Sequence, residues 1–538
     1  MSVFDYVIVG AGPAGCVLAY RLSENPRRSV LLIEAGPRDS HPFIHMPKGI
    51  GKIMGDANYT WAFTTDPDAC NAHTAEYFVR GRTLGGSSAI NGMMYVRGQP
   101  ADYDAMAEET SQDWDWTHIG EAYRQLESHE LGPDATRGNA GPLHISMPNL
   151  RDPLTEAMIA AGVSLGLPLK RDTNTPDDGE GVGYAPRTVY RGRRESAASA
   201  FLTPIRNRPN LSIITGAMVD RLELDGRKVV GVRTAAKAGQ KTKVFKAREV
   251  VLCGGAIASP AILQRSGIGA ADLLVALNVP VLIDQPQVGH NMMEHRALVM
   301  QWRIKPDSIS QNRQYRGPLL IANTLRYYLS RSGPMSAATY EAGAWFKTRP
   351  ELNRPDGQFL LAPYSFNFDS EVVDVEREGG INICAYMLRP QSRGEVGIRS
   401  RDPAELPRIQ PNYHATEGDR RTMIDVVRYA RRFVSQPSLA ALISDETRPG
   451  PAFVTDEEVL DAYDRFGNGA YHASGTCRMG KDEASVVDPR ARVRGVENLR
   501  VVDASIFPFI TAGNTNGPVM AIAWRAADLI LEDEVRNR

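Results

Sequence analysis

Short apolar runs near the N-terminus give the first structural signal in the sequence. Tyr6 to Val9 and Val30 to Ile33 are continuous apolar segments of the length that buried parallel strands need. A helical pattern rich in Ala and Leu lies between them, and a third run of the same character covers 249–253. The pattern predicts a strand, a helix and a second strand, followed by a later return to the same parallel sheet.

A different pattern occupies the chain from about 301 to 455. Strand-like stretches at 358–363, 382–388 and 395–399 are separated by polar turns, without the alternating helices that a parallel sheet needs. This region therefore favours a mostly antiparallel sheet with helices on one side.

Two further segments have clear local signals. Asp225-Gly226 predicts a β-hairpin between the apolar runs 210–219 and 229–234. Near the C-terminus, the pattern predicts a helix over 519–534, and Pro518 suits its first turn because the missing N–H costs nothing there.

A glycine motif joins the first strand to the first helix. Gly10-x-Gly12-x-x-Gly15 permits a tight turn, a close backbone approach to a pyrophosphate and close packing of helix on strand. Glu34 ends the second strand, about 20 residues further on, where an acid accepts hydrogen bonds from a ribose. The motif predicts a dinucleotide site, and on its own it fits NAD as well as FAD. The residues expected there are Gly10, Ala11, Gly12, Pro13, Ala14, Gly15, Glu34 and Ala35.

Composition narrows the functional class. A chain of 538 residues is expected to form two closely joined domains. Its 62 basic and 63 acidic residues leave a net charge of -1, which gives no case for nucleic-acid binding. The basic cluster 191–194 is short and is expected to lie on a solvated or interdomain face. Five scattered cysteines indicate neither a disulfide framework nor a metal site, and they fit a reducing compartment.

The sequence also bears on location. The chain enters its first strand almost at once, and no run approaches 18 apolar residues, so neither a signal peptide nor a transmembrane segment is expected. We expect a cytoplasmic protein; peripheral attachment at the inner membrane would leave no such trace.

A second glycine loop lies at Gly85-Gly86-Ser87-Ser88, where the serines can cap a following helix. A nicotinamide enzyme does not need a second close backbone approach so near the first, whereas a cofactor with a ribityl chain and a three-ring head does. The segment 81–104 resembles the first signature of the glucose–methanol–choline (GMC) family of FAD oxidoreductases, and 255–269 resembles the second. The resemblance covers essentially the whole chain.

The resemblance implies an α/β fold: a Rossmann-like FAD-binding domain and a second α+β substrate domain on a mostly antiparallel sheet. The expected limits are 1–155, 195–300 and 465–538 for the first domain, and 156–194 and 301–464 for the second.

The resemblance also implies further FAD contacts. These are Trp61, Arg82, Leu84, Gly85, Gly86, Ser87, Ser88, Asn91, Gly92, Met93, Met94, Val96, Val219, Tyr471, Asp503, Ala504, Asn514, Thr515, Asn516 and Pro518. Choline oxidases tether FAD through a histidine just ahead of the position of Asn91. Because Ile90 stands there, noncovalent FAD is expected.

The chemistry is expected near the C-terminal end. A lone histidine is usually a packing residue, but His472 matches the catalytic histidine of the family in the pattern H-x-x-G-T. By the same resemblance, Asn516 is expected to be its partner, although it could also cap the helix. Asn514 could take its place, but the spacing to Pro518 favours Asn516. His290 and His295 are expected to be structural.

The resemblance implies hydride transfer from an alcohol to FAD, with His472 as general base and Asn516 orienting the oxygen. The expected function is oxidation of primary, fairly apolar alcohols to aldehydes, with electrons passed to a quinone or other acceptor. An oxidase that reduces oxygen to peroxide is the alternative, and a flavin-containing hydroxynitrile lyase is a remote one. Residues 335–345, with Phe366 and Phe368, are expected to line the substrate pocket.

Overall fold

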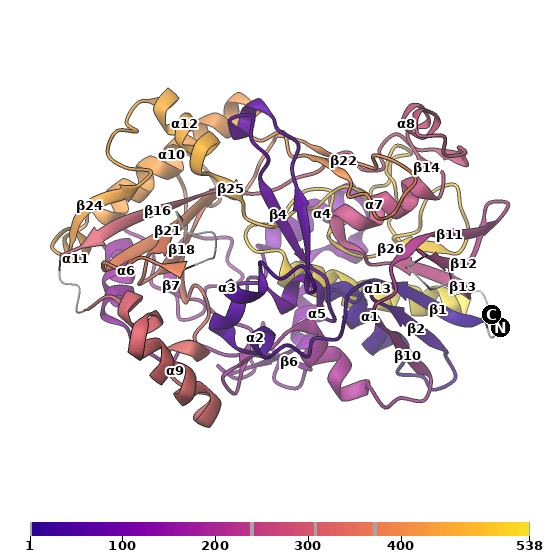
Figure 1. The fold of residues 1–538 in the computed structure, drawn as a ribbon, viewed down its shortest axis with the longest axis horizontal. Coiled ribbons are helices and arrows are strands. Elements are labelled where there is room, and N and C mark those ends of the chain that lie inside the picture. Colours follow the sequence, from indigo (N-terminus) through magenta and orange to yellow (C-terminus); the bar gives the residue numbers. More distant parts are fainter. Residues whose placement is uncertain (1–2, 237–241, 306–308, 369–373, 537–538) are drawn as a thin grey trace.

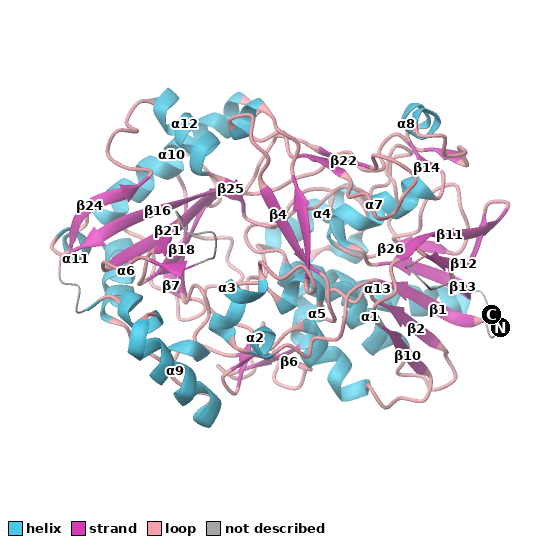
Figure 2. Ribbon diagram, viewed as in Figure 1, coloured by secondary structure: helices cyan, strands magenta, loops and turns pink. Residues whose placement is uncertain are grey.

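Two β-sheets organise the computed structural model, which describes residues 3–236, 242–305, 309–368 and 374–536. Figure 1 places the sheets at opposite ends of the long axis, with both termini at the end formed by the first sheet. Helices pack around each sheet, and long loops cross the region between them (Figure 2). This architecture confirms the expected combination of an α/β part and an antiparallel part.

The first sheet has the strand order β10-β2-β1-β13-β12-β11, with β26 beside β13. Strands β10, β2, β1, β13 and β26 are parallel, which confirms the predicted parallel strands. The predicted hairpin is also present, but its first strand is β11; the apolar run before it forms β10 and pairs with β2. The bounds are β1 (Phe4–Val9), β2 (Val30–Ile33), β10 (Leu211–Ile214), β11 (Val219–Asp225), β12 (Lys228–Thr234), β13 (Val244–Leu252) and β26 (Leu499–Val501).

Helices bury the apolar strands of this sheet. The helices α1 (Pro13–Leu22) and α13 (Asn516–Arg536) pack on each other, and α5 (Trp116–Leu126) packs on α13. The fully buried side chains of Val7, Leu18 and Ile522 belong to this core. Gly15 is required where α1 meets the β1 turn, because a Cβ there would lie 1.9 Å from the Gly10 carbonyl oxygen.

The second sheet has the order β24-β16-β21-β18-β17-β7, with β25 beside β16, and its neighbouring strands are antiparallel. The predicted strands 358–363 and 382–388 correspond to β18 and β21. The stretch 395–399 also contains a strand, β22 (Glu395–Gly397), but it pairs with β23 (Arg408–Gln410) in a separate antiparallel pair instead of joining the second sheet. The bounds are β7 (Gly181–Tyr184), β16 (Arg296–Ile304), β17 (Ala342–Phe346), β18 (Gly357–Ala362), β21 (Gly380–Met387), β24 (Ile443–Arg448) and β25 (Asn468–Gly469). The predicted domain limits stay a prediction.

The two faces of the second sheet have different neighbours. Leu298 and Met300 of β16 pack with the helices α6 (Pro153–Ser164), α10 (Glu417–Val434) and α12 (Asp456–Phe466). Their neighbour Val299 points to the opposite face, because successive side chains of a strand alternate. That opposite face is turned towards the first sheet and is available for a binding site.

Shorter elements connect the two sheets. A segment after β2 holds α2 (Pro42–His45), η1 (Pro47–Gly49) and α3 (Ile50–Ile53), and β3 (Thr60–Thr64) then pairs with β4 (Tyr77–Gly81). The other helices include η3 (Gly86–Ala89), α4 (Pro100–Glu109), α7 (Gly255–Arg265), α8 (Ala271–Ala276), α9 (Gly317–Ser330), η9 (Pro334–Ser336) and α11 (Pro437–Ala440). The other strands are β5 (Glu127–His129), β6 (Leu143–Ile145), β8 (Val189–Tyr190), β9 (Arg193–Arg194), β14 (Ile268–Gly269), β15 (Ile283–Asp284), β19 (Phe366–Asn367) and β20 (Asp374–Val375). No helix within the described ranges combines the length and apolar character that a bilayer crossing requires.

A buried ion pair supports the region beside the second glycine loop. Arg97 Nε donates to Glu127 Oε1 at 2.9 Å, and both side chains are almost completely buried. The hydroxyl of Tyr95 donates to the same carboxylate. Loss of one buried partner is costly because the other charge then has no counter-charge and no water.

We expect Glu127→Gln to lower the stability by about 3–5 kcal/mol, since Arg97 stays charged and buried. The measurement is the urea midpoint of the purified protein, followed by far-ultraviolet circular dichroism. Glu121→Gln is the matched control, because Glu121 pairs with Arg124 on the surface and such pairs contribute little. Equal midpoints for the two variants would contradict the role assigned to the buried pair.

Candidate active site

A continuous cavity of about 820 Å³ runs between the two sheets. Gly10 and Gly12 line it at the first sheet, and His472 lines it at the other end. The face of the second sheet contributes Val299 and Leu360 to its wall. The cavity thus joins the predicted dinucleotide site to the predicted catalytic histidine.

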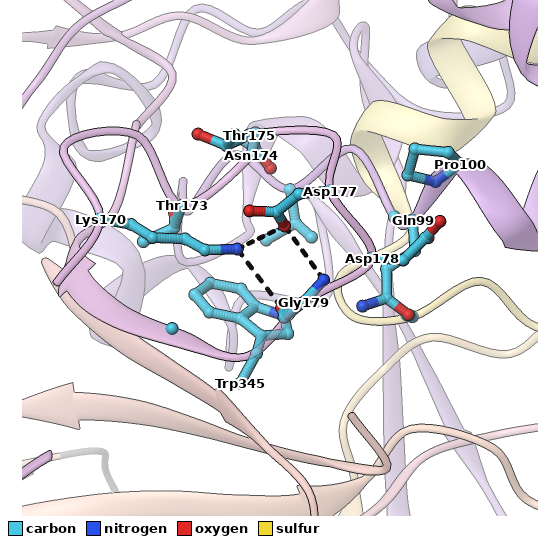
Figure 3. A pocket seen from close by; sticks show the side chains of 14 residues that line it. Gln99, Pro100, Lys170, Thr173, Asn174, Thr175, Asp177, Asp178, Gly179 and Trp345 are labelled. Atoms are coloured by element: carbon cyan, nitrogen blue, oxygen red, sulfur yellow. Dashed lines mark hydrogen bonds and ion pairs between the residues drawn. The ribbon is translucent and has the colours of Figure 1, made fainter. Parts of the chain in front are cut away.

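A second cavity has only about 20 Å³ of space, which is room for about one water molecule. Figure 3 shows Lys170, Asp177 and Trp345 around it. Lys170 Nζ is already bonded to Asp177 Oδ1 at 2.7 Å and to the Gly179 carbonyl at 3.3 Å. Of these two cavities, only the large one can hold a cofactor and a substrate.

The two glycine loops meet at one end of the large cavity. Gly10 has a φ of 104°, and a Cβ there would lie 2.4 Å from the Cys253 carbonyl oxygen. Gly86 has a φ of 51°, and a Cβ there would lie 2.7 Å from Gly12 Cα. The Gly85 N–H donates to the Ala11 carbonyl at 2.8 Å, so the loops form one backbone cradle. The Gly12 N-cap makes no side-chain hydrogen bond, which leaves the first N–H groups of α1 for an anion.

Glu34 is held at the end of β2. Its carboxylate accepts hydrogen bonds from the Ala11 N–H at 2.9 Å and from the Gly36 N–H at 2.8 Å. Burial raises its pKa, while these backbone donors oppose that rise. Glu34 lines the cavity beside Ala35, where the sequence places the ribose.

Most of the predicted cofactor residues line the cavity. They are Gly10, Gly12, Pro13, Ala14, Glu34, Ala35, Trp61, Gly86, Ser87, Asn91, Gly92, Met93, Met94, Val219, Tyr471, Asp503, Ala504, Asn514, Thr515 and Asn516. Asp503 also joins β26 to α7, because it accepts from the Gly255 N–H at 2.8 Å and from Ser259 Oγ at 2.6 Å.

The other predicted cofactor residues are not among those that line the cavity. Ser88 Oγ donates to the Gly85 carbonyl, and Arg82 lies over the Trp61 ring with its guanidinium carbon 4.7 Å from the ring centre. These residues support the cradle instead of lining it. The full set is Ala11, Gly15, Arg82, Leu84, Gly85, Ser88, Val96 and Pro518.

Three polar side chains meet at the other end of the cavity. His472 follows β25, His295 precedes β16, and Asn514 precedes α13. Nδ1 of His472 lies 2.9 Å from Nδ1 of His295, and Nε2 of His472 lies 3.1 Å from Nδ2 of Asn514. Nε2 of His295 lies 3.1 Å from the Leu388 carbonyl oxygen.

These contacts determine which nitrogens carry hydrogen. A carbonyl oxygen can only accept, so the His295 Nε2–H donates to Leu388 and the His295 Nδ1 is an acceptor. His472 must then donate from Nδ1. Its Nε2 therefore carries a lone pair, which accepts a hydrogen bond from the Asn514 amide.

Burial keeps both rings neutral. It lowers the pKa of His295 to about 3. Burial, together with His295 and Arg80, lowers the pKa of His472 well below its ordinary value of 6.5. A neutral imidazole with an available lone pair is what a general base requires.

Glu294 fixes the backbone of this histidine pair and was not found from the sequence. Its Oε1 accepts from the His472 N–H at 2.7 Å and from the His295 N–H at 2.9 Å. Burial raises the pKa of Glu294 to about 7, against the opposing effect of Arg80. Nothing in the sequence around Glu294 distinguishes it from other acids beside a strand.

The expected partner of His472 requires correction. The amide that meets His472 is that of Asn514, whereas Asn516 lines the cavity as the first residue of α13. Gly513, with a φ of 104°, turns the chain so that Asn514 points at the imidazole. Spacing to Pro518 could not reveal this turn.

The two remaining histidine expectations have different outcomes. His290 is about half exposed and lies 3.4 Å from Glu395 in an ion-pair contact, away from the histidine pair. His295 was expected to be structural, yet it contacts the ring of His472 directly and sets its hydrogen-bonding state.

The predicted substrate segment lines the cavity only in part. Thr339, Tyr340, Phe366 and Phe368 are on its wall, whereas Met335 packs against Tyr327 and Met46 in a separate cluster. Burial raises the pKa of Tyr340 well above its ordinary range and that of Cys384 to about 12, so both groups are neutral at physiological pH. Thr339 Oγ1 and Asn514 Oδ1 are buried without a hydrogen-bond partner among the described residues, as expected where a bound molecule supplies one.

Comparisons with known proteins find relatives over nearly the whole chain. Two models described as GMC oxidoreductase match residues 4–297 and 390–523. The chain is 38% identical to an alcohol dehydrogenase (acceptor) of Pseudomonas putida, over 98% of this chain and 96% of that protein. It is 39% identical to an oxygen-dependent choline dehydrogenase of Serratia proteamaculans, over 98% and 95% of the two chains.

A solved structure shows the same fold. The pyridoxine 4-oxidase from Mesorbium loti superposes with a TM-score of 0.88 at 33% identity, covering 98% of this chain and 99% of that one. Matches of this extent show that the chain belongs to the GMC oxidoreductase family and is an FAD-binding oxidoreductase that acts on an alcohol.

Proposed function

We propose that this protein oxidises primary, fairly apolar alcohols to aldehydes and passes the electrons to a quinone or a similar acceptor. The observation that carries the proposal is the neutral His472, whose Nε2 lone pair faces the Asn514 amide at 3.1 Å in the cavity. The chemistry that FAD supplies when bound is acceptance of a hydride from the alcohol carbon.

The residues that would hold FAD follow from the cavity. The backbone around Gly10 and Gly86 would hold the pyrophosphate, and Glu34 would hold the ribose of the adenosine. The N-terminus of α13 begins at Asn516 and lies on the cavity wall. Its partial positive charge of roughly half an electron favours negative charge at that end of the site.

His472 and Asn514 would divide the work on the alcohol oxygen. A substrate hydroxyl would replace the hydrogen bond between His472 Nε2 and Asn514 Nδ2. The hydroxyl would donate its hydrogen to His472 Nε2, and the Asn514 amide would donate to the hydroxyl oxygen instead. As His472 takes the proton, the Asn514 amide stabilises the negative charge that develops on the oxygen. Removing the proton is necessary because an alcohol that keeps it is a poor hydride donor.

The wall of the cavity supports an apolar substrate. Val299, Leu360 and Cys384 come from one face of the second sheet, and Tyr340 and Phe366 lie beside them. Although Glu76 and Asp374 also line the cavity, these five side chains carry no charge. Alkyl and aryl alcohols gain from burying apolar surface against them.

The acceptor is the second part of the proposal. The relative from Pseudomonas putida is named an alcohol dehydrogenase with an unspecified acceptor, and a pyridoxine 4-oxidase has a similar structure. An oxygen-using alcohol oxidase is therefore the alternative. Alcohol turnover in air separates the two, because the oxidase forms hydrogen peroxide and the dehydrogenase needs a quinone or dye.

The catalytic assignment predicts a clear order among three variants. We expect His472→Ala to slow anaerobic flavin reduction by about 10²–10⁴-fold, which is the usual contribution of a general base. Asn514→Ala is expected to slow it more than Asn516→Ala, because Asn514 meets the base. Stopped-flow bleaching of the flavin by a saturating alcohol is the measurement, and His290→Ala is the control. Near-normal bleaching by His472→Ala would refute the assignment.

The pH dependence follows from the lowered pKa of His472. Because the base must be unprotonated, a lowered pKa extends activity towards acid, and flavin reduction should stay constant as pH falls through 6.5. We expect His295→Ala to slow the reaction and His295→Gln to recover part of the rate, since the glutamine oxygen can still accept from the His472 Nδ1–H. An unchanged rate and pH profile in His295→Ala would contradict this positioning role.

We also propose that FAD is held without a covalent bond at the position of Ile90, because its buried aliphatic side chain cannot bond to a flavin. Acid precipitation should release the yellow flavin into the supernatant. Colour that remains in the protein pellet would contradict the proposal.

A further inference from the structure

Helix α9 carries an exposed apolar face. Ile321, Leu325, Tyr328 and Leu329 are 65%, 59%, 46% and 87% exposed. Their spacing of three or four residues places them on one side of the helix. We call these four residues the α9 apolar face.

The opposite side of α9 attaches the helix to the protein. Tyr327 is fully buried, and its hydroxyl donates to the His45 carbonyl at 3.1 Å. Tyr327 also packs with Met46 and Met335. The apolar face is therefore the side that points away from the protein, and Figure 1 shows α9 projecting at the periphery.

Single exposed apolar residues are ordinary, but a row of large ones along a helix marks an interaction site. An exposed helix face normally carries polar residues, so this face is costly in water unless something covers it.

Basic residues surround this face. Arg326 lies on α9, and Arg331 follows it and contacts the ring of Tyr328, with its guanidinium carbon 5.6 Å from the ring centre. Arg191 and Arg193 are exposed beside the end of α9, because Gly192 lies against the Arg331 backbone.

The charge on and beside α9 is mostly positive, although Glu195 lies close enough to Arg193 for this arginine to oppose the rise in the Glu195 pKa that burial causes. Within the described residues, no ion pair joins any of these four arginines to an acid. The sequence between Asp307 and Glu341 contains no acidic residue. Arg194, the last residue of the basic cluster, is buried instead and donates to the Ile44 carbonyl at 2.9 Å.

This positive charge favours an anionic surface over a second copy of the chain as the partner. A second copy of the chain on a two-fold axis would bring the same unpaired arginines near one another, which opposes association. The surface of a bilayer with anionic phospholipids offers the complementary arrangement, with phosphates for the arginines and acyl chains for the apolar side chains.

We propose that the α9 apolar face, with Arg191, Arg193, Arg326 and Arg331, docks this protein on an anionic phospholipid surface. The helix would lie in the plane of the interface and would not cross it. Helix α9 is hydrogen-bonded to α2 through the Tyr327 hydroxyl and the His45 carbonyl. Helix α3, which follows α2 along the chain, contributes Ile50 to the cavity wall. Docking would thus bring one wall of the cavity close to the bilayer, where apolar alcohols and quinones dissolve.

Vesicle sedimentation of the FAD-loaded protein tests the proposal. We expect binding to vesicles of phosphatidylcholine with phosphatidylglycerol, and weaker binding to phosphatidylcholine alone or at high salt. The double variant Leu325→Ser/Leu329→Ser should lose binding. Arg326→Gln and Arg331→Gln should each weaken it about fivefold, the contribution expected of one basic residue near an anionic surface.

Two controls separate docking from misfolding and from self-association. Leu169→Ser, at a position that is 67% exposed and outside α9, should bind vesicles normally. All variants should keep their flavin and their dye-linked alcohol activity, which also keeps this test independent of the acceptor proposal. Equal vesicle binding by the double variant would overturn the proposal. So would a wild-type dimer that the double variant converts to a monomer in light scattering.

Discussion

The hydrogen-bond chain from the Leu388 carbonyl through His295 to His472 is the interaction on which the chemistry of this site depends. The Leu388 carbonyl can only accept a hydrogen bond, so His295 must donate from Nε2 and accept at Nδ1. His472 must then donate from Nδ1, which leaves the lone pair on its Nε2. The second sheet fixes the first contact. Ala297 of β16 is paired with Tyr386 of β21, and continuing that antiparallel register places His295 opposite Leu388.

The two sheets divide the work between binding and chemistry. The first sheet carries the parallel strands and glycine loops that form the backbone cradle around Gly10 and Gly86. The second sheet supplies His295 and the apolar wall that includes Val299. His472 and Asn514 lie on loops that return from β25 and lead into α13, so three separated segments assemble the base and its partners. Glu294 joins two of these segments by accepting both histidine N–H groups.

Much of the fold could be predicted because its signals are local. The glycine motif after β1 and the apolar runs of β1 and β2 depend on neighbouring residues only, and the structure shows them as expected. Strand partners depend on distant contacts. The run at 211–214 therefore joined β2 instead of a hairpin, and β22 formed a pair outside the second sheet.

The site was predictable to a similar extent. His472 was found through its motif. The choice between Asn514 and Asn516 depended on the backbone turn at Gly513, and the spacing of these residues to Pro518 does not reveal that turn. The role of His295 depended on a contact between rings 177 positions apart in the sequence.

The hydrogen position on His472 tests the central claim most directly. Neutron diffraction from deuterium-exchanged crystals of the FAD-loaded protein at neutral pH would locate it. The account predicts deuterium on His295 Nε2 and on His472 Nδ1, with none on His472 Nε2. Deuterium on His472 Nε2 in the resting protein would contradict the account, because that nitrogen could not then take the proton of an alcohol.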